Sequence, residues 1–232
     1  MITELQKAFK HVQYFDLEHV YINTNTGEKL PSVTGYIKQF QPEFQEDYWL
    51  GIKSQERGIT KEELKKEWKW TSKIAVEMGS ALHSFLEQKV QRRHIVPTIP
   101  EYLDSNKFEI LVRQAEEYVE TLDCTIIACE FVMSNMENTL AGMCDRLSLS
   151  NDNKLIITDY KTGQLKKAYG KHKKPYQFLT DSSLDKYSLQ LNYYRDFLES
   201  RGFEVERLEI VWFNENNPTF EIFEIPKFQI SQ

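Results

Sequence analysis

The sequence predicts an α/β (α+β) fold in which helices flank a central mixed β-sheet. Its apolar residues follow a helical period up to about residue 122 and then change to the short runs that are typical of strands. Three such runs, at 125–133, 139–150 and 154–161, are separated by turns short enough for hairpins. A further helical segment then precedes two more strands, and this order of elements is typical of a mixed sheet.

Residues 1–58 are expected to form a hairpin and short helices ahead of that sheet. Residues 18–23 alternate toward a short strand, and the segment "TNTGEKLP" has the composition of a hairpin turn. The next segment, "PSVTGYIKQF", predicts a short helix with Ser32 as its N-cap, because a serine hydroxyl can accept a hydrogen bond from a free amide of the first turn.

Residues 59–122 are expected to form a helical part. Thr60 and Glu63 have the spacing of a capping box, which predicts the start of a long helix. Gly79 is a position where this helix could break, and the two prolines of "HIVPTIPEY" are expected to end it. A second amphipathic helix is predicted over 106–122.

Residues 123–232 are expected to contain the central sheet. After the three hairpin-linked strands, leucines that recur every seven residues predict a helix over 183–201, and Gly202 is placed to end it. Two final strands are predicted at 204–213 and 219–225, on either side of the turn "NENNP". We expect the whole chain to form one domain.

Composition narrows the class of protein. Hydrophobic residues make up 41% of the 232 residues, which is enough for a packed core, and no apolar run is long enough to cross a membrane. The N-terminal segment lacks the pattern of a signal peptide. The odd number of cysteines, 3, favours a reducing compartment. We therefore expect a cytoplasmic protein with no membrane partner.

The distribution of charge is more informative than its sum. The net charge of −6 argues weakly against a nucleic-acid partner. However, the segment 161–176 contains six lysines and no acid, and such a cluster can follow a phosphate backbone. A solvated, flexible loop is the alternative explanation for the same run.

The ends of two predicted strands carry charged groups. Asp159 and Lys161 directly follow the apolar run "LIIT" and, two residues apart on a strand, point to the same face. Asp145 lies at the end of "GMCD" in the preceding strand, so pairing of the two strands would bring both carboxylates together. Adjacent carboxylates repel unless a cation lies between them, and oxygen ligands suit Mg²⁺ or Mn²⁺. Two unrelated surface carboxylates are the alternative.

Two predicted helices carry further candidates. His83 and Glu87 are four residues apart on one helix face, where both could approach a metal, although single histidines are seldom ligands. Gln190 and Tyr194 share a face of the later helix, next to Arg195, and could contact phosphates or orient the lysine strand. Tyr194 also fits the apolar stripe of that helix.

The order of these elements resembles the PD-(D/E)XK nuclease superfamily and, within it, the RecB-like exonuclease branch. Asp145 and the "DYK" of 159–161 match the motif that names the superfamily. His83 matches the additional metal-ligand histidine of the branch, and Gln190 with Tyr194 matches its Q-x3-Y signature. The segment "LPSVTGYI" is similar to the mitochondrial genome-maintenance exonucleases and their phage relatives.

The resemblance implies a restriction-endonuclease-like core and a role for each matching residue. Lys161 would serve the attacking water, and Gln190 and Tyr194 would complete the catalytic group. The residues implied to hold the metal are Asp145, Asp159, His83 and the backbone carbonyl of Tyr160, with Glu87 and Glu130 as further candidates. A surface carboxylate on an edge strand is the alternative for Glu130.

The resemblance also implies contacts to DNA. The candidates are hydroxyl groups at a helix start and basic side chains beside the catalytic lysine: Ser32, Thr34, Lys166, Lys167, Lys171, Lys173, Lys174 and Arg195. Helix capping explains the two hydroxyl groups equally well. Trp68 and Trp70 could stack on unpaired bases, but two residues apart on a helix they cannot share a face.

We therefore expect a Mg²⁺- or Mn²⁺-dependent DNA exonuclease of recombination, repair or replication. Its substrate would be DNA that is single-stranded or has a free end, and a recombination or replication protein is a candidate partner. If it is encoded by a phage, it would act in the host cytoplasm. The alternatives are an endonuclease, a nickase or an RNA-directed nuclease of the same superfamily, or a catalytically silent module that binds DNA ends. Some members of the branch carry four cysteines for an iron–sulfur cluster, and this chain lacks those spacings, so no iron–sulfur cluster is expected.

Overall fold

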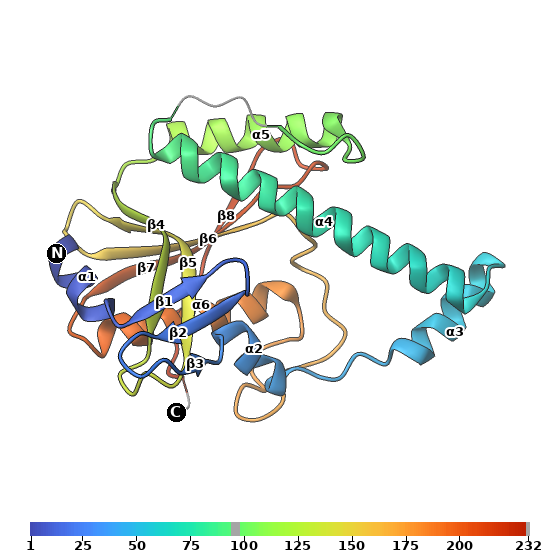
Figure 1. The fold of residues 1–232 in the computed structure, drawn as a ribbon. Helices are drawn as coiled ribbons and strands as arrows, with labels where there is room; N and C mark the ends of the chain where they lie inside the picture. The colour runs from blue at the N-terminus through green and yellow to red at the C-terminus, as the bar shows by residue number, and fades with distance from the viewer. Residues whose placement is uncertain (94–97, 231–232) are drawn as a thin grey trace.

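The structure, a computed structural model, describes residues 1–93 and 98–230, and a five-stranded mixed β-sheet lies at its centre (Figure 1). The strands follow the order β4 (Thr125–Ser134), β5 (Ala141–Leu149), β6 (Leu155–Lys161), β7 (Val205–Trp212) and β8 (Glu221–Glu224). β6 and β7 are parallel, and the other neighbours are antiparallel. The predicted α+β fold with a central mixed sheet is confirmed.

A single helix connects the two parallel strands. α6 (Ser183–Glu199) runs between β6 and β7, because parallel neighbours need a crossover rather than a tight turn. The Ser182 hydroxyl accepts a hydrogen bond from the amide of Asp185 at 3.1 Å and caps its start. Gly202, at φ +83°, turns the chain away after its end, as the sequence predicts.

A smaller sheet precedes the central one. It consists of β1 (Val12–Phe15), β2 (Val20–Asn23) and β3 (Lys29–Leu30), and it follows α1 (Ile2–Phe9). The predicted hairpin corresponds to β2 and β3. The sequence predicts short helices in residues 1–58 but does not give the positions of α1 and β1, which are 8 and 4 residues long. Such short elements depend on tertiary packing, here the burial of Leu5 and Phe9 of α1.

The remaining helices are α2 (Val33–Ile37), the 3₁₀-helix η1 (Lys38–Phe40), α3 (Glu46–Arg57), α4 (Lys61–Val90) and α5 (Ser105–Glu120). Ser32 caps α2 by accepting from the amide of Gly35 at 2.9 Å. Thr60 and Glu63 form the predicted capping box at the start of α4, with both reciprocal hydrogen bonds present. In the described ranges, 1–93 and 98–230, no helix is both long enough and apolar enough to span a bilayer.

α4 passes through Gly79 without interruption, so the break considered at that position does not occur. One glycine costs a helix about 1 kcal/mol, and the burial of Met78 and Leu82 on either side outweighs that cost. A Cβ at position 79 would lie 3.3 Å from the Thr162 hydroxyl, so glycine lets the chain after β6 approach the helix closely. The expected stop at "HIVPTIPEY" includes residues 94–97, which lie outside the described residues, and α4 ends at Val90.

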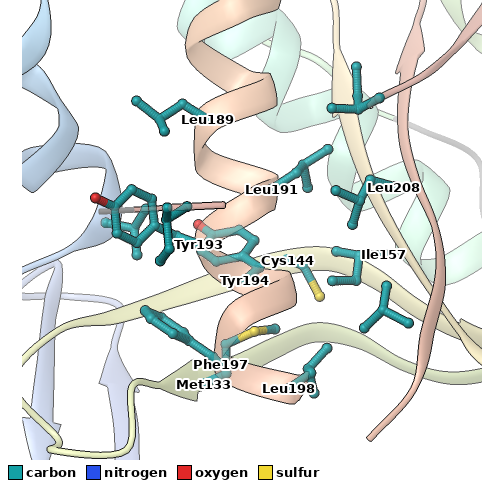
Figure 2. Packing of buried hydrophobic residues seen from close by; sticks show 14 of the residues in the cluster. Met133, Cys144, Ile157, Leu189, Leu191, Tyr193, Tyr194, Phe197, Leu198 and Leu208 are labelled. Carbon is teal, nitrogen blue, oxygen red and sulfur yellow. The ribbon is translucent and has the colours of Figure 1, made fainter. Parts of the chain in front are cut away.

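Each face of the central sheet is covered by its own hydrophobic cluster. α4 and α5 cover one face, where Tyr160 and Phe213 contribute from the strand side. α6, α1 and the small sheet cover the other face. Figure 2 shows Tyr194 of α6 close to Cys144 of β5. β6, in the middle of the sheet, is therefore enclosed on both sides and is held rigidly.

The packing of α6 on β5 predicts a sharp effect at Gly142. A Cβ at this position would lie 2.9 Å from the Tyr194 hydroxyl and would overlap the ring. Overpacking of this kind costs about 1–3 kcal/mol, so Gly142→Ala should lower the free energy of unfolding by that amount in urea titrations. Gly163→Ala, where no atom lies within 4 Å of the new Cβ, is the matched control. Equal effects of both changes would contradict the packing described.

Candidate active site

The C-terminal end of β6 lies between α4 and α6 and carries the residues "DYK" (Figure 1). Asp159 is only 3% exposed although it is an acid, and Tyr160 after it is also buried. Buried carboxylates are rare unless they are paired or bind a cation. The strand end therefore presents a carboxylate from a rigid and enclosed position.

Asp145 is the neighbour of Asp159 on the adjacent strand. Arg146 of β5 is paired with Thr158 of β6 in the antiparallel register, and Asp145 and Asp159 are the next residues of the two strands beyond this pair. One oxygen of Asp145, Oδ2, accepts a hydrogen bond from the amide of Tyr160 at 2.6 Å. The structure therefore brings together the two carboxylates that the sequence analysis singled out.

The ammonium of Lys161 contacts the side chain of Asp159 and the backbone carbonyl of Tyr160. Its Nζ lies 2.5 Å from Oδ2 of Asp159 and donates to the carbonyl of Tyr160 at 2.9 Å. The same ammonium lies 4.5 Å from the centre of the Tyr187 ring of α6, at cation–π distance. Lys161 thus occupies the position between Asp159 and the predicted carbonyl ligand.

His83 reaches the carboxylates from α4. Its Nδ1 lies 3.5 Å from Oδ1 of Asp145, and its ring meets that of Tyr160 edge-on at 5.9 Å between centroids. Gly79, one helical turn earlier, allows the close approach of Thr162 that brings this part of α4 to the end of β6.

The charges of the four groups shift one another's pKa values. Burial alone would lower the pKa of His83, but the charge of Asp145 and its contact with the ring outweigh burial and raise it above 6.5. His83, Lys161 and the Tyr160 amide lower the pKa of Asp145 to about 2 against the effect of burial. Burial and the nearby Asp145 raise the pKa of Asp159 despite its ion pair with Lys161. The two carboxylates raise the pKa of Lys161 against burial, so it stays protonated at neutral pH.

These donors fit a hard divalent cation. Two carboxylates, one carbonyl oxygen and one imidazole form a set that suits Mg²⁺ or Mn²⁺. The raised pKa of Asp159 beside Asp145 shows a repulsion that a cation between them would relieve. In the part of the chain that the structure describes, no three His, Cys, Asp or Glu side chains are already gathered as a metal site. Instead, Lys161 pairs with Asp159 and His83 contacts Asp145.

Glu87 and Glu130 lie at the edge of this group. Glu87 accepts a hydrogen bond from the Gln91 side chain at 3.2 Å. Burial raises the pKa of Glu130, and the charges of Glu87 and Asp145 raise it further. The backbone of Glu130 has φ +49°, a conformation that non-glycine residues rarely adopt. Glu130 is therefore within electrostatic range of Asp145, and Glu87 is within range of Glu130.

The three candidate residues on α6, Gln190, Tyr194 and Arg195, do not all point toward the carboxylates. Gln190 donates a hydrogen bond to the Tyr194 hydroxyl at 2.9 Å, and both side chains are buried. Burial raises the pKa of Tyr194, and the charges of Tyr21 and Asp159 add to the shift, so the tyrosine lies within electrostatic range of Asp159. Arg195 points elsewhere, because it donates to the carbonyl of Phe228 at 2.8 Å and pairs with Glu199 at 3.2 Å.

Most of the residues predicted to contact DNA lie in the loop between β6 and α6, residues 162–182. Lys166 pairs with Glu221 at 2.9 Å, so its charge is already partly neutralised. Lys167 lies over the Tyr169 ring. The loop is anchored through backbone bonds, in which the amide of Lys173 donates to the carbonyl of Phe40 at 2.6 Å. The remaining candidates lie in exposed stretches of this loop, Lys171 and Lys174, or in the first turn of α2, Ser32 and Thr34.

Sequence reasoning assigned no role to two features of the site. Tyr187, which belonged to an apolar stripe, lies against Lys161. On the opposite face of the sheet, Arg146 is 1% exposed, donates to the Thr158 hydroxyl at 2.9 Å and lies 3.6 Å from Glu209. An arginine and a glutamate inside two apolar strands were the only signal of this pair.

Comparisons with known proteins add one assignment. A model of the PD-(D/E)XK nuclease superfamily matches residues 58–224. No curated protein matches the chain. A solved structure, "Crystal structure of SSO0001", is 14% identical, with a TM-score of 0.30 over 51% of this chain and 48% of that chain. The chain thus spans about half the length of that protein.

The superfamily match covers well over half of the chain. It includes α4 with His83, the β5–β6 hairpin with Asp145, Asp159 and Lys161, and α6 with Gln190. The chain belongs to the PD-(D/E)XK nuclease superfamily.

Proposed function

We propose that this chain is a divalent-metal-dependent DNA exonuclease of the RecB-like branch, similar to the mitochondrial genome-maintenance exonucleases and their phage relatives. We further propose that it acts in recombination, repair or replication. Membership of the superfamily implies a metal-dependent nuclease with DNA as its substrate. The observation that supports the active site is the meeting of Asp145, Asp159, Lys161 and His83 at the end of β6.

The metal ligands in this proposal are Asp145, Asp159, His83 and the carbonyl of Tyr160. When bound, the divalent cation supplies positive charge that makes a water nucleophilic and stabilises negative charge on the phosphate. The amide of Tyr160 keeps Asp145 oriented through its hydrogen bond of 2.6 Å. Burial of Asp159 in the strand limits its motion, so the ligands are arranged before the substrate arrives.

Lys161 acts as a cation and hydrogen-bond donor in this proposal. Its raised pKa keeps it charged, so it can orient the attacking water or neutralise an oxygen of the scissile phosphate. The oxygen of the water forms the new bond to phosphorus, the bond to the 3′ oxygen breaks, and a 5′-phosphate and a 3′-hydroxyl result. Gln190 and Tyr194 act next to Asp159, where their mutual hydrogen bond holds the tyrosine hydroxyl in place.

Substitution of the strand-end residues tests the site. Asp159→Asn and Lys161→Ala should each lower Mg²⁺-dependent degradation of end-labelled linear DNA by about a hundredfold or more, because the first removes a charged metal ligand and the second removes a positive charge that stabilises the transition state. Asp152→Asn, an exposed change at the turn of the same hairpin, is the matched control and should keep the parental rate. Parental activity of Asp159→Asn or Lys161→Ala in a folded protein would show that the proposed site is wrong.

The choice of substrate tests the exonuclease assignment. Digestion of single- and double-stranded DNA, each linear and circular, should proceed only on molecules with a free end. Cleavage of circular single-stranded DNA as fast as the linear form would identify an endonuclease of the same superfamily. Equal degradation of an RNA strand would contradict the preference for DNA.

The raised pKa of His83 predicts how metal binding depends on pH. Without metal, Asp145 favours the protonated imidazole, which cannot be a ligand. The affinity for Mn²⁺ should therefore rise as pH increases from about 6 to about 8, since binding releases the proton of His83. Calorimetric titration with Mn²⁺ across this range measures the effect.

His83→Ala is the comparison in this titration. This variant should bind Mn²⁺ more weakly and lose most of the pH dependence. Unchanged affinity and an unchanged slope would remove His83 from the metal ligands and leave the two aspartates as candidates.

A further inference from the structure

A hollow of about 820 Å³ extends to Lys186 of α6, whose ammonium lies over the same Tyr187 ring as that of Lys161. Its walls are the segment 41–45, α3, the N-terminal part of α4 and the loop after β6. Figure 1 shows that α3 and this part of α4 project beyond the central sheet. The volume is in the range of ligand sites in proteins, about 300–1,000 Å³. Two of the residues that line it, Trp68 and Lys167, are candidate DNA contacts from the sequence, and the proposed catalytic and metal-binding residues are not among its lining residues.

Four aromatic side chains line the hollow: Phe44, Trp49, Trp68 and Tyr169. Phe44 and Tyr169 are 68% and 72% exposed, which leaves large rings in contact with water. The rings of Phe44 and Trp68 are tilted by 55° at 6.2 Å, and those of Trp49 and Tyr169 by 51° at 6.1 Å. Neither pair is stacked face to face, and the exposed surface of Phe44 and Tyr169 is available to a planar ligand.

Lysines connect the hollow to the carboxylates. Lys167 lines it with its Nζ 5.1 Å above the Tyr169 ring, and Lys186 lines it on the side of α6. The ammonium groups of Lys186 and Lys161 both lie over the ring of Tyr187, at 5.4 Å and 4.5 Å from its centre. A chain that places a ring in the hollow can therefore place negative charge along Lys186 and Lys161.

One of the two acids that line the hollow already has hydrogen-bond partners in the loop. Asp181 accepts hydrogen bonds from the amides of Tyr169 and Gly170, at 2.6 and 2.8 Å, so it holds the loop in shape. Glu43 is the other acid among the lining residues. Lys53, a third lining lysine, pairs with Glu56 at 2.7 Å outside the hollow. Flat rings alternating with ammonium groups match the alternation of bases and phosphates in a nucleic-acid strand.

We propose that this hollow binds unpaired nucleobases of the DNA strand whose phosphate reaches Asp159 and Lys161. The inference rests on the proposed nuclease function and specifies its substrate, a strand end with several unpaired nucleotides. Paired bases in a duplex have their faces covered by stacked neighbours, so they cannot stack on Trp68 or Tyr169.

The experiment compares binding of two oligonucleotides to the inactive Asp159→Asn protein in Mg²⁺. One is a fluorescent single strand of about 15 nucleotides, and the other carries abasic sugars at both ends, so that it keeps the phosphates but lacks terminal bases. Anisotropy should show that the intact strand binds about fivefold to a hundredfold more tightly, the range for loss of stacking on one base.

Further substitutions in the Asp159→Asn protein test whether this difference in affinity arises in the hollow. Trp68→Ala and Tyr169→Ala should bind the intact strand more weakly and bring the ratio of the two affinities close to one. Trp70→Ala is the matched control, because Trp70 lies on the same helix but packs against Tyr102 outside the hollow, and it should keep the parental ratio.

Several outcomes would overturn the proposal. A parental ratio near one, or a parental ratio retained by Tyr169→Ala, would do so, and the exposure of Tyr169 makes this variant informative even if Trp68→Ala does not fold. The binding assay involves no cleavage, so a lack of nuclease activity in the parental protein would refute the proposed function without deciding this test.

Discussion

The ionisation of two neighbouring carboxylates in a buried strand end is the constraint on which the rest of the structure depends. Asp145 and Asp159 lie on the neighbouring strands β5 and β6, and the repulsion between their like charges contributes to the raised pKa of Asp159. Lys161 and His83 offset this repulsion, one at each carboxylate. The opposite shifts of the two aspartate pKa values show that the offset is unequal. In the proposed function, the same imbalance favours a divalent cation.

The fold holds these groups in place from both faces of the sheet. The pairs Arg146–Thr158 and Thr158–Glu209 connect β5, β6 and β7 in one row directly behind the aspartates. On the near side, α6 supplies Tyr187 against Lys161. The site is therefore built mainly on regular elements rather than on loops, which favours a fixed catalytic geometry.

Much of this arrangement could be predicted from the sequence because it depends on local patterns. The short turns of the β4–β6 meander determine which strands pair, so the meeting of Asp145 and Asp159 follows from their positions in adjacent strands. Other features depend on distant contacts. Arg195 follows Tyr194 directly in the sequence, yet its side chain is held by a hydrogen bond to the carbonyl of Phe228. Lys166 likewise forms an ion pair with the distant Glu221. The hollow depends on where α3 lies relative to the loop after β6, whereas the sequence predicts only that residues 1–58 contain short helices.

The central claim, that the strand end holds a divalent cation, can be tested directly by anomalous diffraction from crystals grown with Mn²⁺. The account predicts an anomalous peak within about 2.5 Å of carboxylate oxygens of both Asp145 and Asp159, with Lys161 displaced from Asp159 toward the substrate side. A peak at another place in the protein, or a cation that contacts neither aspartate while Lys161 stays on Asp159, would contradict it.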